Sequence, residues 1–471
     1  MSTDRHVVII GGGVAGLAAA HTLLGAPDAP RVTLLERADR LGGKVMGTPF
    51  GGLANVECGA DMFLARTPAA VDLATELGLA DDLVAPAALP SYVWSGGQLH
   101  PLPDGLLLGT PMALGPLARS GLLTWKGKAR AALEPFLPRY DAGDALGVAV
   151  RQRFGDEVLE QLVGPLVGGI NAGDPDRLSL RGVAPQVAEA LEHHRSLLLG
   201  LRAQLKAQRK SRAAGAAPPI FLAPRSGVSA LVERLAASVV ARGGRIHLGT
   251  PAEAVEPRPD RRWSVATAGG PDVAEADQLV LASPADVTSG LLAAIDAEAA
   301  AALAAIAYAS VAMITVAVKD DAIRRPIRAS GYLVPRTQQR TLAACSWGSA
   351  KWSQWRRPGQ TVLRISAGHD GDDRPLHLDD ADLTAAVLDD LDRQIGLDGQ
   401  PSEVRITRWW RALPQYAPGH VERIDAVLAR LAGGAPGIHL AGAAYKGLGI
   451  PACIAQGQAA ARAALADATR S

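Results

Sequence analysis

The sequence is poor in cysteine and nearly balanced in charge. Its three cysteines, Cys58, Cys345 and Cys453, lie far apart among 471 residues and form no CxxC pair. This spacing argues against a disulfide framework and a zinc motif, so we expect small buried thiols in a reducing compartment and no bound metal. A formal net charge of +1 gives no global field that would recruit nucleic acid.

Long uninterrupted apolar runs are also missing. The stretch 7–24 is broken by four glycines, and 105–123 contains two prolines and Arg119. We therefore expect no transmembrane segment and no signal peptide, and we expect a cytoplasmic monomer. A one-sided contact of 105–123 with a membrane surface stays open. The length and the 48% hydrophobic content fit a globular chain of two domains.

Apolar runs, glycines and prolines divide the chain into blocks. The pattern predicts strands at 6–10 and 32–36 around a glycine-rich turn and helix. Ser95-Gly96-Gly97 predicts a hairpin turn. Further predictions are a helical block at 112–210, a helix at 227–242, mainly strands at 308–368, an acidic helix at 379–395, and a final strand, glycine-rich turn and alanine-rich helix.

A glycine element follows the first predicted strand. Gly11-Gly12-Gly13-Val14-Ala15-Gly16 has the GxGxxG spacing. Its first glycine permits a tight turn, its second lets a pyrophosphate approach the backbone, and its third lets helix and strand pack closely. Glu36 comes 20 residues later at the end of the second strand, where an acid can accept hydrogen bonds from a ribose diol. Together these features predict a dinucleotide-binding βαβ unit.

The residues after Glu36 narrow the cofactor. The stretch 37–44, RADRLGGK, resembles the continuation found in flavin amine oxidases and their relatives. This resemblance implies FAD, with the Gly42-Gly43 turn along its phosphates and Lys44 offsetting their charge. Arg37 joins the expected contacts. A polar loop without a ligand is the alternative.

Four further segments resemble the protoporphyrinogen/coproporphyrinogen oxidase family. They are LPDGLLLGTP (102–111), RFGDEVLEQLVGPLVGGINAGDPDRLSLRGVAPQ (153–186), RWWRALPQYAPGH (408–420) and LAGAAYKGLGIPACIAQG (440–457). The resemblance implies an α/β fold: a Rossmann-type FAD-binding domain, as in flavin amine oxidases, with an inserted α+β substrate domain and a helical subdomain. We expect residues 1–88, 220–290 and 405–471 in the FAD-binding domain, 89–111 and 291–404 in the substrate-binding domain, and 112–219 in the helical subdomain.

The last of these segments would form the other side of the cofactor site. A buried strand leads through Gly447 and Gly449 to a helix that starts near Pro451. Free N–H groups at this helix start would point at an electron-rich group. The resemblance assigns FAD contacts here to four residues, namely Ala443, Leu448, Gly449 and Ile450.

The resemblance implies further site residues. Expected beside the flavin are Gly59, Ala60, Asp61 and Met62, with Val255 at the adenine through its backbone and Trp409 along the cofactor. Candidate substrate residues are Tyr332, Leu333, Trp347 and Lys446. Core packing is the alternative for Trp409 and for the first three substrate candidates.

The implied activity is the six-electron oxidation of coproporphyrinogen III to coproporphyrin III in heme biosynthesis. Three hydrides would pass in turn to FAD N5, and O2 would reoxidise the flavin and give hydrogen peroxide. The sequence shows no Ser/His/Asp set and no paired carboxylates, so we assign no catalytic acid or base. Alternatives are protoporphyrinogen IX as the substrate, another flavin amine oxidase or carotenoid desaturase, and a non-catalytic flavin- or porphyrin-binding protein.

Two positions depart from the animal and plant members of the family. Ser91 stands where those members often have a basic residue credited with holding a propionate, and Asp61 stands where they often have Arg. This favours the bacterial branch, whose substrate has four carboxylates instead of two. A basic run could make a transient contact with the next heme-pathway enzyme or with acidic lipid, or could be a solvated helix end: Arg202, Lys206, Arg209, Lys210 and Arg212.

Overall fold

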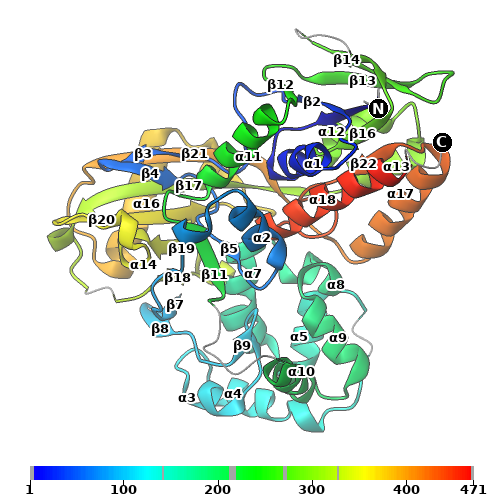
Figure 1. Ribbon diagram of the computed structural model, residues 1–471. Helices are drawn as coiled ribbons and strands as arrows, with labels where there is room; N and C mark the ends of the chain where they lie inside the picture. Colours follow the sequence, from blue (N-terminus) through cyan, green and yellow to red (C-terminus); the bar gives the residue numbers. More distant parts are fainter. Residues whose placement is uncertain (1–4, 141–142, 212–218, 269–272, 326–327, 468–471) are drawn as a thin grey trace.

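A five-stranded parallel sheet lies in the upper right of the molecule as drawn in Figure 1. The computed structural model describes residues 5–140, 143–211, 219–268, 273–325 and 328–467. The sheet takes its strands from three distant parts of the chain, in the order β12 (Arg245–His247), β2 (Arg31–Leu35), β1 (His6–Ile10), β16 (Gln278–Leu281) and β22 (Ile438–Leu440).

Both faces of this sheet are covered. Val7 and Ile9 of β1 belong to one hydrophobic core, and Val8 and Ile10 belong to another. This explains why the strand is a continuous apolar run, as expected for a parallel strand buried on both sides. The first core contains α1 (Val14–Leu24), α2 (Pro68–Glu76), α11 (Ser229–Ala241) and α18 (Ile450–Asp467). The second contains α12 (Ala285–Leu292), α13 (Ala297–Ala304), α17 (His420–Gly434) and the sheet of β13 (Ala252–Pro257), β14 (Trp263–Thr267) and β15 (Val273–Ala276).

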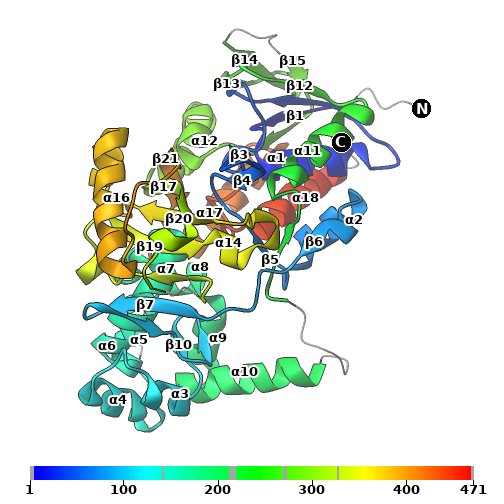
Figure 2. The ribbon, with the colours of Figure 1, turned by 90° about the vertical axis from the view of Figure 1, so that its left-hand side faces the viewer.

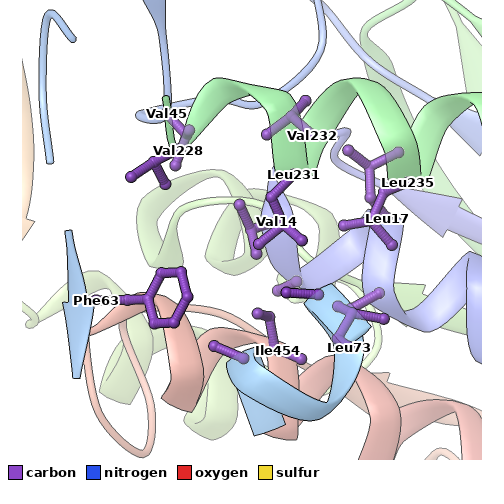
Figure 3. Packing of buried hydrophobic residues seen from close by; sticks show 14 of the residues in the cluster. Val14, Leu17, Val45, Phe63, Leu73, Val228, Leu231, Val232, Leu235 and Ile454 are labelled. Atoms are coloured by element: carbon purple, nitrogen blue, oxygen red, sulfur yellow. The ribbon is translucent and has the colours of Figure 1, made fainter. Parts of the chain in front are cut away.

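Helix α1 is held between two other helices. Figure 3 shows Val14 and Leu17 of α1 near Leu231 of α11 and Ile454 of α18. Leu17 and Ile454 are fully buried. The start of α1, which directly follows the glycine turn, is therefore fixed by packing against helices from the middle and the C-terminal end of the chain.

A seven-stranded sheet forms the second large layer, seen at the left of Figure 1. Its order is β21 (Glu403–Pro414), β17 (Tyr308–Lys319), β20 (Gln360–Ala367), β19 (Leu342–Trp347), β18 (Gly331–Leu333), β7 (Ser91–Ser95) and β8 (Gln98–Pro101). Leu383, Val387 and Leu391 of α16 (Asp380–Ile395) pack in the core of this sheet. Asp379 caps α16 by accepting from the Asp382 backbone N–H at 2.8 Å.

Helices fill the lower part of Figure 2. They are α3 (Leu114–Arg119), α4 (Trp125–Ala132), α5 (Leu146–Phe154), α6 (Asp156–Val158), α7 (Gly164–Asn171), α8 (Leu180–Val183), α9 (Pro185–His193) and α10 (Leu197–Ser211). A π-helical turn at Leu159–Val163 leads into α7, and Ala172 ends α7 in the left-handed conformation with φ 48°. The helices share one core, which includes Phe154, Leu162 and Leu201.

Short elements connect these layers. They are β3 (Gly47–Phe50), β4 (Leu53–Glu57), β5 (Phe63–Leu64), β6 (Leu83–Val84), β9 (Leu106–Leu107), β10 (Thr110–Pro111), β11 (Phe221–Pro224), α14 (Gly348–Lys351) and α15 (Arg374–His377). β11 pairs with both β5 and β6, so the chain returns from the helical block beside the segment that entered it.

Most predicted elements are present with slightly shifted ends. The strand predicted at 32–36 is β2 (Arg31–Leu35), and the helix predicted at 227–242 is α11 (Ser229–Ala241). The predicted hairpin turn joins β7 to β8. Within the described ranges, no helix is both long enough and apolar enough to cross a membrane.

Candidate functional site

The three glycines of the GxGxxG pattern, Gly11, Gly13 and Gly16, have different surroundings in the turn after β1. Gly11 has φ +115°, and a Cβ there would lie 2.7 Å from the Ala282 carbonyl oxygen. A Cβ at Gly16 would lie 1.9 Å from the Gly11 carbonyl oxygen. A Cβ at Gly13 would meet no described atom within 4 Å. Gly11 and Gly16 thus serve close packing, whereas Gly13 borders open space.

Glu36 fixes the loop that faces this turn. Its Oε2 accepts the Gly12 backbone N–H at 2.7 Å, and its Oε1 accepts the Ala38 backbone N–H at 2.9 Å. Both carboxylate oxygens of Glu36 therefore hold backbone N–H groups of the two loops in place. Each oxygen keeps a lone pair, so the side chain can still accept a hydrogen bond from a ligand.

A cleft of about 420 Å³ opens along the carboxyl ends of the parallel strands. Its wall combines residues from both ends of the chain with residues from the middle. Twelve of the expected cofactor residues line it: Gly11, Gly13, Val14, Ala15, Glu36, Arg37, Gly43, Lys44, Trp409, Ala443, Leu448 and Ile450.

The other expected cofactor residues stand behind or beside this wall. Gly59 is adjacent to it, because a Cβ there would lie 2.7 Å from the Lys44 carbonyl oxygen. Val255 is buried in the second core. Gly12, Gly16 and Gly449 belong to the two turns, and Ala60 is exposed. Met62 packs against the first core, and Asp61 forms an ion pair inside the protein.

Sequence reasoning missed several residues of the wall. Thr250 and Pro251 lie between β12 and β13, and Ala252 begins β13. Ala282, Ser283 and Pro284 follow β16. Tyr308 lies on β17, Arg411 on β21 and Cys453 on α18. One available signal was position. Ligands of open parallel sheets bind outside the carboxyl ends of the strands, and Ala282 directly follows β16.

Burial shifts the pKa of three side chains in the cleft wall. Lys44 is open to the cleft but surrounded by protein atoms, and burial lowers its pKa from 10.5. Its Nζ lies 5.7 Å from the centre of the Tyr308 ring. Burial raises the pKa of Tyr308 to about 12 and that of the Cys453 thiol to about 11. At neutral pH the phenol and the thiol therefore keep their protons.

Tyr416 ties the C-terminal turn to the segment that follows β21. Its hydroxyl donates to the Ala443 carbonyl oxygen at 2.6 Å and accepts from the Gly447 backbone N–H at 2.9 Å. The His420 ring stacks on Tyr416 with centroids 4.0 Å apart. This pair belongs to the PQYAPGH string, and it shapes the turn that carries Leu448 and Ile450 to the cleft.

Asp61 is the centre of a buried charge cluster. Its Oδ2 lies 2.9 Å from Lys351 Nζ and 3.3 Å from an Arg364 nitrogen, and it accepts from the Trp352 indole at 2.9 Å. Burial alone would raise the pKa of Asp61, but the two cations outweigh it and hold the pKa well below the usual carboxyl range. Arg364 also donates to the Gly59 carbonyl oxygen, which connects the cluster to the cleft wall.

The expected substrate residues are scattered. Tyr332 and Trp347 lie in the core of the seven-stranded sheet, where the Tyr332 hydroxyl donates to Gln394 at 2.7 Å. Lys446 is half exposed and pairs with Asp425 at 2.7 Å on the surface. Leu333 approaches α7, because a Cβ at Gly169 would lie 2.9 Å from its side chain. In the basic run, Arg202 donates to the Met112 carbonyl oxygen, while the side chains of Arg209 and Lys210 and all of Arg212 lie outside the described part.

Residues 14–465 match the family described as flavin containing amine oxidoreductase. The chain belongs to this family. The α/β fold and the cleft, whose wall comes from both ends of the chain, agree with that membership. The predicted fold class is confirmed. The family membership confirms that the cofactor is a flavin.

Named relatives narrow the place of the chain within the flavin oxidoreductases. It is 34% identical over 474 residues to coproporphyrinogen III oxidase from Bacillus subtilis (strain 168), covering 98% of each chain. It is 30% identical over 495 residues to protoporphyrinogen oxidase from Bos taurus, covering 97% of this chain and 98% of the relative. The predicted resemblance to the protoporphyrinogen/coproporphyrinogen oxidases is therefore confirmed.

A solved structure extends the likeness to three dimensions. The crystal structure of a protein from Exiguobacterium sp. 255-15 superposes with a TM-score of 0.86 at 32% identity, over 98% of this chain and 99% of that one. The likeness thus includes both sheets and the helical block.

Proposed function

We propose that this chain is an FAD-dependent oxidase that converts coproporphyrinogen III to coproporphyrin III with O2. The main support is the full-length likeness to coproporphyrinogen III oxidases together with a cleft that carries the flavin elements at both ends of the chain. Conversion of a porphyrinogen to a porphyrin removes six electrons and six protons, so three O2 are reduced to three H2O2.

The cleft residues fit FAD. Gly13 leaves room for a phosphate beside free N–H groups at the start of α1, which has no side-chain cap. Lys44 supplies a cation to the same space. The start of α18 brings Leu448 and Ile450 to the cleft, where its helix dipole favours negative charge. When bound, the flavin would accept hydride equivalents from the substrate and pass the electrons to O2.

The chain itself contributes placement more than acid–base chemistry. The phenol of Tyr308 and the thiol of Cys453 both keep their protons near neutral pH, so neither acts as a base there. Trp409 donates its indole N–H to the Cys58 carbonyl oxygen at 3.0 Å, which fixes the ring along the wall. A fixed wall holds reactants in a productive orientation and excludes water.

The division into three parts is also proposed, with two adjustments. Strand β21 (Glu403–Pro414) pairs with β17 along its length and thus joins the seven-stranded sheet. We therefore propose that the cofactor segment at the C-terminus begins after Pro414 instead of at residue 405. The middle cofactor segment, proposed as 220–290, extends to Ala304, because α12 and α13 both pack in the second core of the five-stranded sheet. The segment 1–88 and the helical block 112–219 stay as proposed.

Anaerobic mixing tests the function. The purified chain carrying FAD is mixed with coproporphyrinogen III without O2, and the flavin absorbance near 450 nm is followed. We expect rapid bleaching, then formation of porphyrin and H2O2 in a 1:3 ratio when O2 is admitted. A flavin that stays yellow would refute the proposal.

The Bos taurus relative favours protoporphyrinogen IX as a second candidate substrate. The same measurement with protoporphyrinogen IX separates the two. If kcat/KM is higher for protoporphyrinogen IX, that substrate replaces coproporphyrinogen III in the proposal.

A further inference from the structure

A second cavity, of about 90 Å³, lies between α7 and the seven-stranded sheet. Its walls are mainly apolar or small and include Gly168, Gly169, Ala172, Val311, Met313 and Leu413. Four polar side chains join them: Arg336, Gln339, Ser366 and His369. The cavity is too small for a whole ligand, but its lining, apolar with a few polar groups, is of the kind that holds one part of a ligand.

The cavity and the flavin cleft share two strands. Tyr308 of β17 and Trp409 of β21 line the cleft, whereas Val311 of β17 and Leu413 of β21 line the cavity. Trp409 and Leu413 pack together against Val311 and Ala172. A flat substrate that reaches across this shared wall would have one part at the cleft and another in the cavity.

Arg336 is held in place by the loop that closes the cavity. Its Nη2 donates to the Asp370 carbonyl oxygen at 2.8 Å and lies 3.0 Å from His369 Nδ1. The Asp370 backbone N–H in turn donates to the Ala172 carbonyl oxygen at 2.7 Å, at the end of α7. The Asp370 carboxylate is engaged by Arg177 at 2.8 Å. The guanidinium is thus fixed between the sheet and the helical block.

The other end of this guanidinium makes a long ion pair but no hydrogen bond to a described residue. Nη1 of Arg336 is buried and has no hydrogen-bond partner among the described residues. The nearest carboxylate is that of Asp174 at 3.8 Å, which is beyond hydrogen-bond distance. Arg336 is also the one Arg or Lys among the described residues of the cavity wall. A buried N–H of a cation that lacks a partner is costly, and a ligand carboxylate would satisfy it.

We propose that Arg336 binds one carboxylate arm of the substrate, whose ring edge enters this cavity. The proposal rests on the proposed porphyrinogen oxidation and deepens it, because coproporphyrinogen III carries four such arms. Arg336 is then a specificity-determining residue that does not touch the reacting atoms.

Arg336→Gln tests the charge, and Arg340→Gln is the matched control. Arg340 lies four residues away and pairs with Asp389 at the surface, at 2.6 Å. For Arg336→Gln we expect KM for coproporphyrinogen III to rise about 10- to 100-fold with kcat changed less than about threefold, as for loss of a charged hydrogen bond. Arg336→Lys keeps the charge and should recover part of the loss. Arg340→Gln should leave both constants unchanged.

The tetramethyl ester of coproporphyrin III isolates the carboxylate. Binding of the acid and of the ester to the flavin-loaded enzyme is measured by fluorescence quenching, with ambient light excluded and without turnover. The acid-to-ester affinity ratio should fall about tenfold or more from wild type to Arg336→Gln. An unchanged ratio would refute the role of Arg336. If wild type itself fails to oxidise any porphyrinogen, the proposed function fails instead.

Gly168 tests the cavity separately. A Cβ at this position of α7 would meet no described atom within 4 Å, so Gly168→Ala should fold normally. Gly168→Leu fills the cavity and should weaken coproporphyrin III binding about tenfold or more, while thermal stability and flavin content stay at the wild-type level. Unchanged porphyrin binding by a folded Gly168→Leu would show that the substrate does not enter the cavity.

Discussion

The glycines of the turn after β1 have different structural roles. Gly16 is a packing residue, because a Cβ there would collide with the Gly11 carbonyl oxygen, whereas Gly13 borders the cleft. The spacing alone predicts this division. It cannot predict that Glu36 also holds the turn through the Gly12 N–H, since that contact depends on the loop conformation.

Gly13→Ala and Gly16→Ala should separate cofactor binding from folding. Gly13→Ala adds a methyl group to open space, so we expect an unchanged melting temperature without flavin and an FAD affinity about tenfold weaker. Gly16→Ala forces helix and strand apart and should destabilise the flavin-free chain by about 1–3 kcal/mol. Thermal melts and FAD titrations of both variants measure the two effects. Equal melting temperatures for the flavin-free variants would contradict the packing role of Gly16.

Asp61→Asn should reveal the buried charge cluster. Removing the carboxylate leaves Lys351 and Arg364 without their buried partner, which should cost about 3–5 kcal/mol. Because the pKa of Asp61 is lowered in the folded state, its contribution is full above the ordinary carboxyl value of 3.8 and is lost as the pH falls below it.

Urea unfolding at pH 7, 5 and 3 measures this contribution. The free-energy gap between wild type and Asp61→Asn should be constant from pH 7 to 5 and smaller at pH 3. The control is Asp389→Asn, which breaks an exposed pair and should cost less than about 1 kcal/mol. A gap that widens toward pH 3 would mean that the cations do not stabilise the ionised form.

At the scale of elements, α1 and α18 touch more closely than their sequences suggest. A Cβ at Gly457 of α18 would lie 2.1 Å from the Ala15 carbonyl oxygen of α1. Apolar spacing predicted both helices, but it contains no sign of which glycine faces which helix. This close approach packs the helix that follows the glycine turn against the helix that follows the C-terminal turn.

Gly457→Val should therefore disturb both turns. We expect a loss of about 1–3 kcal/mol in the free energy of unfolding and a lower flavin content after purification. Gly433→Ala on α17, where a Cβ meets no described atom within 4 Å, is the matched control and should be neutral. Calorimetry and the ratio of absorbance at 450 to 280 nm report the two effects. Full flavin content in Gly457→Val would contradict the coupling.

At the scale of the molecule, the site is assembled from parts that are distant in sequence. Local motifs could predict Gly11, Gly13, Lys44 and Leu448, because each lies in a string with a characteristic spacing. They could not predict Tyr308, whose place depends on how β17 crosses to the cleft. They also placed Tyr332 and Trp347 at the substrate, although sheet alternation turns these rings into the core.

Hydrogen exchange with and without FAD tests this assembly directly. If one cofactor spans the cleft, FAD should slow exchange together in three peptides: 11–17, 250–253 and 443–453, whose residues line the same wall. The surface of α10 (Leu197–Ser211) lies in the helical block and should exchange at the same rate in both states. Saturating FAD at 100 times Kd should also stabilise the fold by about 2.7 kcal/mol, because it binds only the folded chain.

The three peptides must respond with the same dependence on FAD concentration. Protection of 11–17 alone would mean that only the phosphate turn binds the nucleotide, and the C-terminal turn would lose its role in the site. The variant Tyr416→Phe refines the result, since it keeps the stacked ring but removes the hydroxyl between Ala443 and Gly447. We expect weaker protection of 443–453 in this variant and normal protection of 11–17, because Tyr416 holds only the C-terminal turn.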